Sequence, residues 1–284
     1  MTNSIPTQPG RSRSPTPKRN SIVQSEGRPW GPASRALREE GVKTLADEAY
    51  QKIREDIIQA RFAPGEKLQP DILKERYDIG LSPVREALSR LARDGLATAE
   101  GQRGFFVAPA SLGELLDVTD LRIHLSIMAV ERSIKFGDDA WENGVVTAYY
   151  QLDKTERQMK RDPVGLSDEW ERRNREFHRQ LESGCESPWL LHFGEVLYDQ
   201  LERYRRLYSV YVEHGPAVHE EHRAIMEAVL ARKADVARDL LAKHFAHARQ
   251  VVLDRMNEPG GKKTLPRKIG KPAAVRKRAT AKQL

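Results

Sequence analysis

Three histidines in the C-terminal half of the chain, His178, His222 and His244, have the side chains best suited to chemistry. Each lies beside the apolar stripe of a different predicted helix. The apolar neighbours are Phe177 and Leu181, Ile225 and Val229, and Leu240 and Leu241. Three imidazoles that converge inside a helical bundle could hold a divalent metal such as zinc. The alternative is that each is an ordinary surface or hydrogen-bonded core histidine, and the spacing alone favours this alternative.

A second candidate site lies on a helix predicted to begin at Ser82, a favourable N-cap, with Pro83 in the first helical position. Apolar residues at helical spacing predict one buried face, whereas Arg85, Ser89 and Arg93 recur every fourth residue on another face. Such a helix can enter the major groove of double-stranded DNA. Because solvated faces with arginines are common, the helix by itself does not establish DNA binding.

The segments around this helix favour DNA binding. A shorter helix and a turn precede it, and two short strands are predicted after it, at 96–99 and 105–108. The loop between the strands has Gln102 and Arg103 at its tip, between two glycines, and such a tip can contact phosphate or the minor groove. This order of elements predicts a winged helix-turn-helix.

The rest of the chain divides by composition. Residues 1–43 are rich in Ser, Pro and Arg and predict a disordered arm, and residues 258–284 predict a disordered basic tail. Between them we expect a mainly α fold, with the winged helix-turn-helix over 44–110 and an antiparallel bundle of about six helices over 111–257. The bundle helices are predicted to begin near Ser111, Asp139, Ser167, Pro188, Val218 and Asp235.

Charge and cysteine content limit the class of protein. The net charge is +7, but the two terminal segments together carry +13, so the part between them is near −6. The single cysteine, Cys185, excludes an intramolecular disulfide framework and is expected to be a small buried residue rather than a nucleophile. No apolar run approaches the roughly 20 residues that span a bilayer. We therefore expect a cytoplasmic, nucleoid-associated protein with no membrane partner.

Several motifs together resemble a known family. They are SPVREALSRLARDGL at 82–96, QRGFFVAP at 102–109 and, in the predicted bundle, REFHRQL, EEHRAI and AKHF. They resemble the GntR family of bacterial transcription regulators, in the class whose C-terminal domain is named FCD after the fatty-acid regulator. Within that class, RYDIGLSPVREALSRL, SGCESPWLL and EVLYDQLERYRRLY are most similar to the carbon-starvation-induced regulators of 4-aminobutyrate and glutarate catabolism. The resemblance covers about 44–256.

The resemblance implies a homodimer that binds a pseudo-palindromic operator. It places Ser82, Arg85 and Ser89 at the DNA, with the wing at Arg103 beside them. One departure concerns Leu81, which stands where many members of the family have an arginine. A base contact usual in the family is therefore expected to be missing, and the operator of a relative cannot be assumed for this chain.

The resemblance also implies a metal in the bundle. In this class an Asp four residues before the first histidine and three histidines bind it, and His178, His222 and His244 occupy the histidine positions. Asn174 occupies the Asp position. A neutral amide is a poorer ligand for a divalent cation than a carboxylate, so we expect zinc or a similar metal at lowered affinity.

A small organic acid is the implied effector, bound beside the metal. Arg122 is the first candidate for its carboxylate, followed by Arg203 and Tyr204. The alternative for each arginine is an ordinary ion pair between helices or subunits. Glutarate or a related dicarboxylate is the expected ligand, on the resemblance to the subgroup alone.

These features predict a ligand-controlled repressor and not an enzyme. In the expected mechanism the acid shifts the spacing of two paired DNA-binding domains so that they fit the operator less well. One rival is a metal-dependent hydrolase built on the three histidines, but the chain has no HExxH and no Gly-rich phosphate loop. The other is a nucleoid-type protein that binds DNA through its basic terminal segments, independently of sequence.

Overall fold

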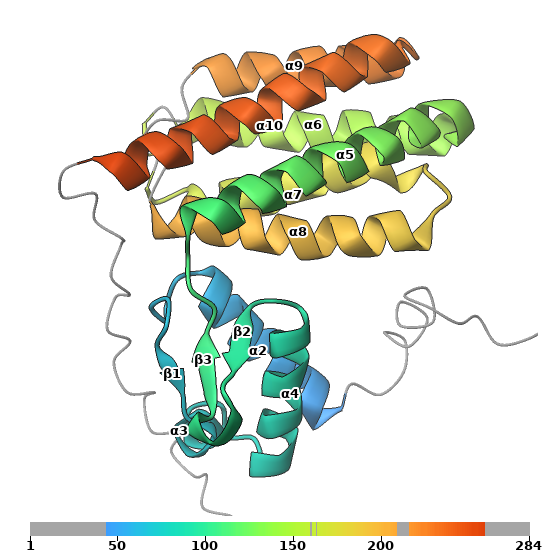
Figure 1. Ribbon diagram of the computed structural model, residues 1–284. Coiled ribbons are helices and arrows are strands. Elements are labelled where there is room, and N and C mark those ends of the chain that lie inside the picture. Colours follow the sequence, from blue (N-terminus) through green and yellow to red (C-terminus); the bar gives the residue numbers. More distant parts are fainter. Residues whose placement is uncertain (1–43, 160, 163, 209–215, 259–284) are drawn as a thin grey trace, which may run out of the picture.

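The computed structural model describes residues 44–159, 161–162, 164–208 and 216–258, which form two parts (Figure 1). We call the N-terminal part the head. Its elements are α2 (Leu45–Ile58), β1 (Lys67–Leu68), α3 (Pro70–Tyr77), α4 (Leu81–Arg93), β2 (Ala97–Ala99), a 3-10 turn (Gly101–Arg103) and β3 (Phe105–Val107). The second part, the bundle, consists of α5 (Leu112–Phe136), α6 (Asp139–Met159), α7 (Ser167–Ser183), α8 (Pro188–Leu207), α9 (Pro216–Leu230) and α10 (Ala234–Asn257).

These elements confirm the expected fold class, a winged helix-turn-helix followed by a helical bundle. The predicted arm over 1–43 and the predicted tail, apart from Glu258, lie outside the described residues. No helix among the described residues is long and apolar enough to cross a lipid bilayer.

The head forms around helices α2 and α4. Thr44 caps α2 in a reciprocal capping box, because its hydroxyl accepts from the Asp47 amide at 3.1 Å while the Asp47 carboxylate accepts from the Thr44 amide at 3.2 Å. The apolar stripes of the two helices share one core. Its fully buried members include Ala49, Ile53, Val84, Ala87, Leu88 and Leu91. The outer face of α4 is thereby left to solvent.

The start of α4 differs from the prediction. The helix begins at Leu81 after Gly80, so Ser82 is not the N-cap and Pro83 is the third helical residue rather than the first. A proline is tolerated there because the first N–H groups of a helix have no partner within it. The first backbone bond is that of the next residue, from Val84 N to Gly80 O at 3.3 Å. Gly95 follows the helix with φ +74°, as expected of a glycine that ends one.

The wing is a three-stranded antiparallel sheet in the order β1-β3-β2. Leu68 pairs with Phe105 and Ala97 pairs with Val107. The two predicted strands are present as β2 and β3, but the sequence analysis missed β1. A strand of two residues has no alternation of apolar and polar positions that could reveal it.

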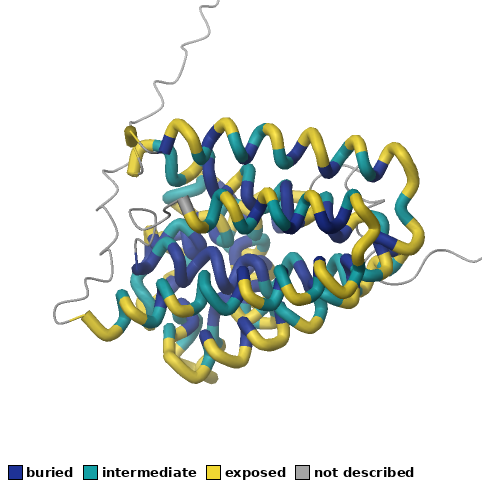
Figure 2. The backbone as a smooth tube through the Cα atoms, turned by 90° about the horizontal axis from the view of Figure 1, so that it is seen from above, coloured by how far each residue is buried: buried dark blue, intermediate teal, exposed yellow. Residues whose placement is uncertain are grey.

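The bundle has the six helices expected between Ser111 and Asn257. Its core is built from large apolar residues on the inner stripes, and Figure 2 shows exposed residues along the outer faces of the helices. Helices α7 and α8 begin at the predicted Ser167 and Pro188. Figure 1 shows that α8 is the bundle helix nearest the head.

Candidate metal and effector site

The three predicted histidines meet inside the bundle. His178 comes from α7, His222 from α9 and His244 from α10, and one nitrogen of each lies within 4.8 Å of the others. All three are buried, and their ring centroids are 4.7 to 5.7 Å apart. They face inward because each occupies the apolar stripe of its helix, next to residues such as Phe177 and Ile225 that are fully buried. The helical period therefore brings together residues that are far apart in the sequence.

Several polar atoms of this cluster are buried without a hydrogen-bond partner among the described residues. They are Nδ1 of His178, Nε2 of His222 and Oδ1 of Asn174. The amide nitrogen of Asn174 donates to the Tyr198 hydroxyl at 2.8 Å, which leaves the amide oxygen as its free acceptor. A buried polar atom left unsatisfied costs about 1–3 kcal/mol. The atoms left free can all donate an electron pair, and a cation can accept from all of them.

Two carboxylates hold the outer nitrogens of two of the rings. Nδ1 of His222 lies 2.8 Å from Glu156, and Nδ1 of His244 lies 2.8 Å from Glu221. An ionised carboxylate accepts a hydrogen bond there, so the hydrogen of each ring lies on Nδ1 and the lone pair on Nε2. Both imidazoles are thus oriented as metal ligands by residues that sequence reasoning had not identified.

The protonation states also suit metal binding. Burial, followed by the charges of His244 and His222, lowers the pKa of His178 well below its usual value. Burial likewise lowers the pKa of His244 to about 4, although the hydrogen bond to Glu221 opposes this shift. Burial would raise the pKa of Glu156, but the charge and hydrogen bond of His222 outweigh it and hold that pKa at about 2. At neutral pH His178 and His244 are therefore neutral, and Glu156 is ionised.

The residues fit a divalent metal. Three imidazoles and one amide oxygen form a donor set of the type that zinc and similar ions accept. The replacement of the expected Asp by Asn174 removes one negative charge from the ligands. Glu156 and Glu221, one hydrogen bond further out, place negative charge near the site again.

A cavity adjoins the histidines. Its volume is about 40 Å³. Its lining includes the candidate metal ligands Asn174, His178 and His244, the basic residues Arg122 and Arg205, and the acidic Glu221. A small anion in this cavity would meet both the metal ligands and guanidinium groups.

Arg122, the first candidate for the effector carboxylate, does line the cavity. Arg122 also forms a buried ion pair between helices, which was the alternative interpretation of this arginine. Its Nη2 donates to Glu182 at 2.8 Å, and its Nη1 donates to the Gly194 carbonyl at 3.0 Å. Its Nε has no partner among the described residues. One donor is thus available without breaking the pair.

Arg203 and Tyr204, the other predicted effector ligands, do not line the cavity. Arg203 donates to the Ala108 carbonyl at 2.9 Å, and the Tyr204 hydroxyl bonds to backbone atoms of Ser111, both at 3.0 Å. They therefore hold the junction between head and bundle. Arg203 is two residues from Arg205, which turns it by about 200° around the helix and away from the cavity.

Two other residues of α8, which the sequence analysis did not name, line the cavity. Tyr198 and Arg205 lie on the same stripe of α8, and Arg205 forms a two-point pair with Glu171 at 2.7 and 2.8 Å. The signal was present in the sequence, because the cavity-lining residues Tyr198, Leu201 and Arg205 follow helical spacing.

The residues predicted to contact DNA are all exposed on the head. Ser82, Arg85 and Ser89 lie on the outer face of α4, and Gln102 and Arg103 lie in the turn of the wing. These positions are therefore accessible to a DNA duplex, as the prediction requires.

A further cation, Lys67 on β1, was missed because that strand was not recognised. Its ammonium lies 5.9 Å from the centre of the Phe106 ring, and the Arg103 guanidinium lies 5.5 Å from the same ring. The wing thus presents two cations over one aromatic ring.

Comparison with known proteins identifies both parts of the chain. Residues 45–107 match the bacterial regulatory proteins of the gntR family, and residues 117–247 match the FCD domain. The HTH-type transcriptional regulator BphR of Paraburkholderia xenovorans, itself uncharacterised, is 40% identical over 74% of this chain and 86% of its own length. The HTH-type transcriptional repressor GlaR of Escherichia coli is 36% identical over 70% of this chain and 91% of its own length.

Solved structures agree in fold. Escherichia coli McbR/YncC superposes with a TM-score of 0.64 at 19% identity and covers 76% of this chain and 100% of its own. A protein described as a GntR regulator from Rhodococcus sp. RHA1 gives 0.59 at 21% identity, with coverage of 74% and 97%.

The metal site predicts a specific pattern of zinc affinities. Protein stripped with a chelator should bind about one equivalent of zinc with a Kd that His222→Ala raises by at least about 100-fold, because a ligand is lost. Glu156→Gln should raise the Kd by about 10–100-fold, because the imidazole loses its orienting carboxylate. Competition titration against a fluorescent chelator measures each Kd.

His124→Ala, which removes an exposed histidine of α5, is the matched control and should leave the Kd unchanged. Asn174→Asp should tighten binding, since it adds a charged ligand. Wild-type binding far below one equivalent, or an unaltered Kd in His222→Ala, would show that the cluster is only structural.

Proposed function

The chain belongs to the GntR family of bacterial regulatory proteins and carries an FCD domain, and from this premise we propose that it is a ligand-controlled repressor. Its relatives are transcriptional regulators rather than enzymes, so the hydrolase considered above is set aside. One observation carries the proposal: an exposed arginine-bearing helix beside a cationic wing is joined to a bundle that buries a histidine cavity. We place its action at chromosomal DNA in the cytoplasm.

In the proposed complex α4 enters the major groove and the wing follows the adjacent backbone. Arg85 and Ser89 supply base or phosphate contacts, and Ser82 lies in the first turn of the same helix. Gln102, Arg103 and Lys67 contact phosphate or the minor groove. In this proposal residues 44–110 bind DNA, and residues 111–257 bind the effector and the second subunit. The two terminal segments add weak, sequence-independent binding to DNA.

A small organic acid is the proposed effector, held in the histidine cavity. A bound divalent metal would supply positive charge for one carboxylate. Arg122 lines the same cavity and has an unpaired Nε, and Tyr198 and Arg205 are further polar residues of the lining. The segments that resemble regulators of 4-aminobutyrate and glutarate catabolism support a dicarboxylate such as glutarate.

We further propose that two chains pair through neighbouring faces of α5 and α8. These faces carry large apolar residues that are 47% to 51% exposed: Leu121, Met128, Trp189 and Phe193. The Trp189 and Phe193 rings stack at 5.7 Å and form one aromatic surface. An exposed surface of this kind favours a self-complementary contact, and pairing would provide the two heads that a pseudo-palindromic operator needs.

The repressor proposal predicts selective DNA binding. By fluorescence anisotropy at near-physiological salt, the full chain should prefer DNA from upstream of its own gene to a shuffled duplex by at least about 100-fold. Arg85→Ala should reduce this preference by about 10–100-fold, as expected for one lost bidentate base contact. Arg157→Ala, an exposed arginine of α6, is the control and should leave it unchanged.

Equal binding to both duplexes, lost when residues 1–43 and 259–284 are removed, would instead support the nucleoid-type alternative. The repressor predicts that the shortened chain still selects the same duplex.

The effector proposal predicts a thermal shift. Glutarate at millimolar concentration should raise the Tm of zinc-loaded protein, because a ligand that binds only the folded state stabilises it. The neutral diamide of glutarate should not raise it, since it lacks the carboxylate charge. An unchanged Tm with glutarate would exclude this acid as the effector.

The pairing proposal predicts that Phe193→Glu yields a monomer in analytical ultracentrifugation, because a charge would be buried in the interface. Tyr150→Glu, at an exposed aromatic residue of α6, is the matched control and should remain dimeric. A dimeric Phe193→Glu protein would move the interface elsewhere.

A further inference from the structure

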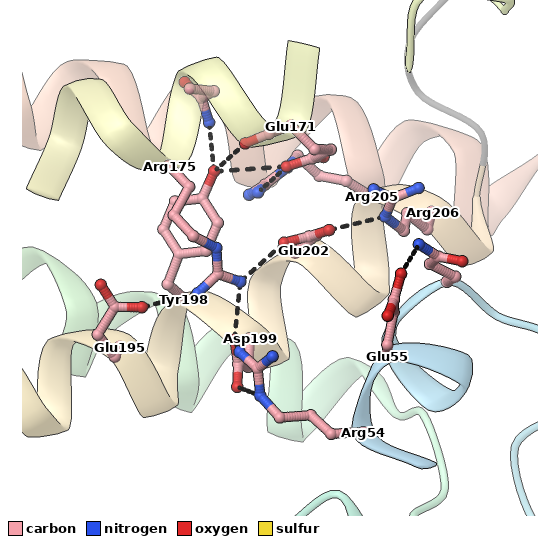
Figure 3. Close-up of polar contacts among 12 residues, drawn as sticks. Arg54, Glu55, Glu171, Arg175, Glu195, Tyr198, Asp199, Glu202, Arg205 and Arg206 are labelled. Carbon is pink, nitrogen blue, oxygen red and sulfur yellow. Dashed lines mark hydrogen bonds and ion pairs between the residues drawn. The ribbon is translucent and has the colours of Figure 1, made fainter. Parts of the chain in front are cut away.

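One buried carboxylate joins the head to the bundle. Asp199 on α8 accepts from Nε of Arg54, on α2, at 2.7 Å, and a second nitrogen of Arg54 bonds to its other oxygen (Figure 3). The same Asp199 accepts from Nη2 of Arg175, on α7, at 2.7 Å. Three helices from two parts of the molecule therefore meet at a single side chain.

Arg175 connects this carboxylate to the histidine cavity. Its guanidinium lies 4.2 Å from the centre of the Tyr198 ring, and Tyr198 lines the cavity. The Tyr198 hydroxyl in turn accepts from the amide of Asn174, the candidate metal ligand next to Arg175 in the sequence. Figure 3 shows the Tyr198 ring beside the Arg175 side chain. Any shift of Tyr198 on ligand binding therefore changes the surroundings of Arg175.

On the other side, α2 is fastened to α4. Arg90 of α4 donates to Asp47 at 2.7 Å and lies 4.5 Å from the centre of the Tyr50 ring. The Tyr50 hydroxyl donates to Asp94, at the end of α4, at 2.6 Å. With the shared apolar core, these bonds make α2 and α4 move as one body. The position of Arg54 thus sets the position of the helix that faces DNA.

The charges allow this contact to open. Asp199 is buried, and burial raises its pKa even though Arg54 and Arg175 oppose the shift. A buried charge left alone is strongly unfavourable, but Asp199 keeps Arg175 when Arg54 leaves. The Arg54 side chain is 23% exposed and can turn to solvent. When the contact between Arg54 and Asp199 opens, Asp199 therefore stays paired with Arg175, and the Arg54 guanidinium is solvated by water.

We propose that Asp199 is a latch that holds the head against the bundle and transmits the state of the histidine cavity to α4. Occupation of the cavity moves Tyr198 and Arg175, which alters the hold of Asp199 on Arg54 and shifts the balance between docked and released heads. The inference rests on the proposed function and names its regulation. The coupling is a difference in operator affinity between the empty and the occupied protein.

Zinc alone is a sufficient probe. We would measure the operator Kd of the full chain, stripped and zinc-loaded, by anisotropy, and amide exchange of 45–58 in both states. The wild-type Kd should change by about fivefold or more in either direction, within the usual range for coupled sites. Asp199→Asn should reduce that change to within about twofold, while zinc affinity and preference for the operator duplex persist.

Glu195→Gln is the matched control. Glu195 lies on the same helix and contacts the same Arg175 at 2.7 Å, but among the described residues it makes no hydrogen bond or ion pair with the head, so coupling should survive. Arg54→Gln removes the latch from the other side, at a partly exposed position, and tests it even if Asp199→Asn does not fold. Both latch variants should lose coupling, and their combination should lose no more than either alone.

The outcomes separate the two proposals. Wild-type coupling retained in Asp199→Asn or in Arg54→Gln would overturn the latch, as would a wild-type protein in which zinc changes neither the operator Kd nor exchange in α2. A wild-type protein that fails to bind zinc or to select the operator contradicts the proposed function instead.

Discussion

Buried lone pairs without a hydrogen-bond partner among the described residues constrain the whole bundle. His178, His222 and Asn174 each hold an unpaired acceptor in the interior, and no apolar packing can compensate for it. The arrangement is sustained because Glu156 and Glu221 fix the outer nitrogens and because helices α7, α9 and α10 are locked around Phe177 and Ile225. The cavity with its two arginines adjoins this polar centre, and contacts from Tyr198 through Arg175 to Asp199 connect it to the head.

Much of this arrangement was predictable from the sequence, for identifiable reasons. The long bundle helices carry strong periodicity, and the three histidines fall on inner stripes, so their convergence required only that the helices pack. The metal assignment needed the family resemblance, since spacing alone favoured ordinary core histidines. The structure adds buried atoms without a hydrogen-bond partner among the described residues, and these favour the metal interpretation.

Other features depend on tertiary contacts that no local pattern reports. Strand β1 forms only because β3 pairs with it. The start of α4 was missed for a local reason, since Pro83 is compatible with the third helical position as well as the first. Arg203 lies in a segment that resembles the regulators named above, but its side chain points from α8 to the junction with the head, where it donates to the Ala108 carbonyl. The pairing of Asp199 with Arg54 joins residues 145 positions apart and could not be found from the sequence.

The junction between the two parts has an evolutionary consequence. Arg203 bonds the carbonyls of Ala108 and Pro109, and Gln200 bonds the carbonyl of Asp94 at 3.1 Å. These bonds recognise main chain, which every amino acid supplies, so side chains on this side of the head other than Arg54 can be replaced without loss of these junction bonds. Mutations that retune which DNA sequence is read can therefore accumulate in the head while the bundle keeps its ligand, and the two specificities can diverge independently.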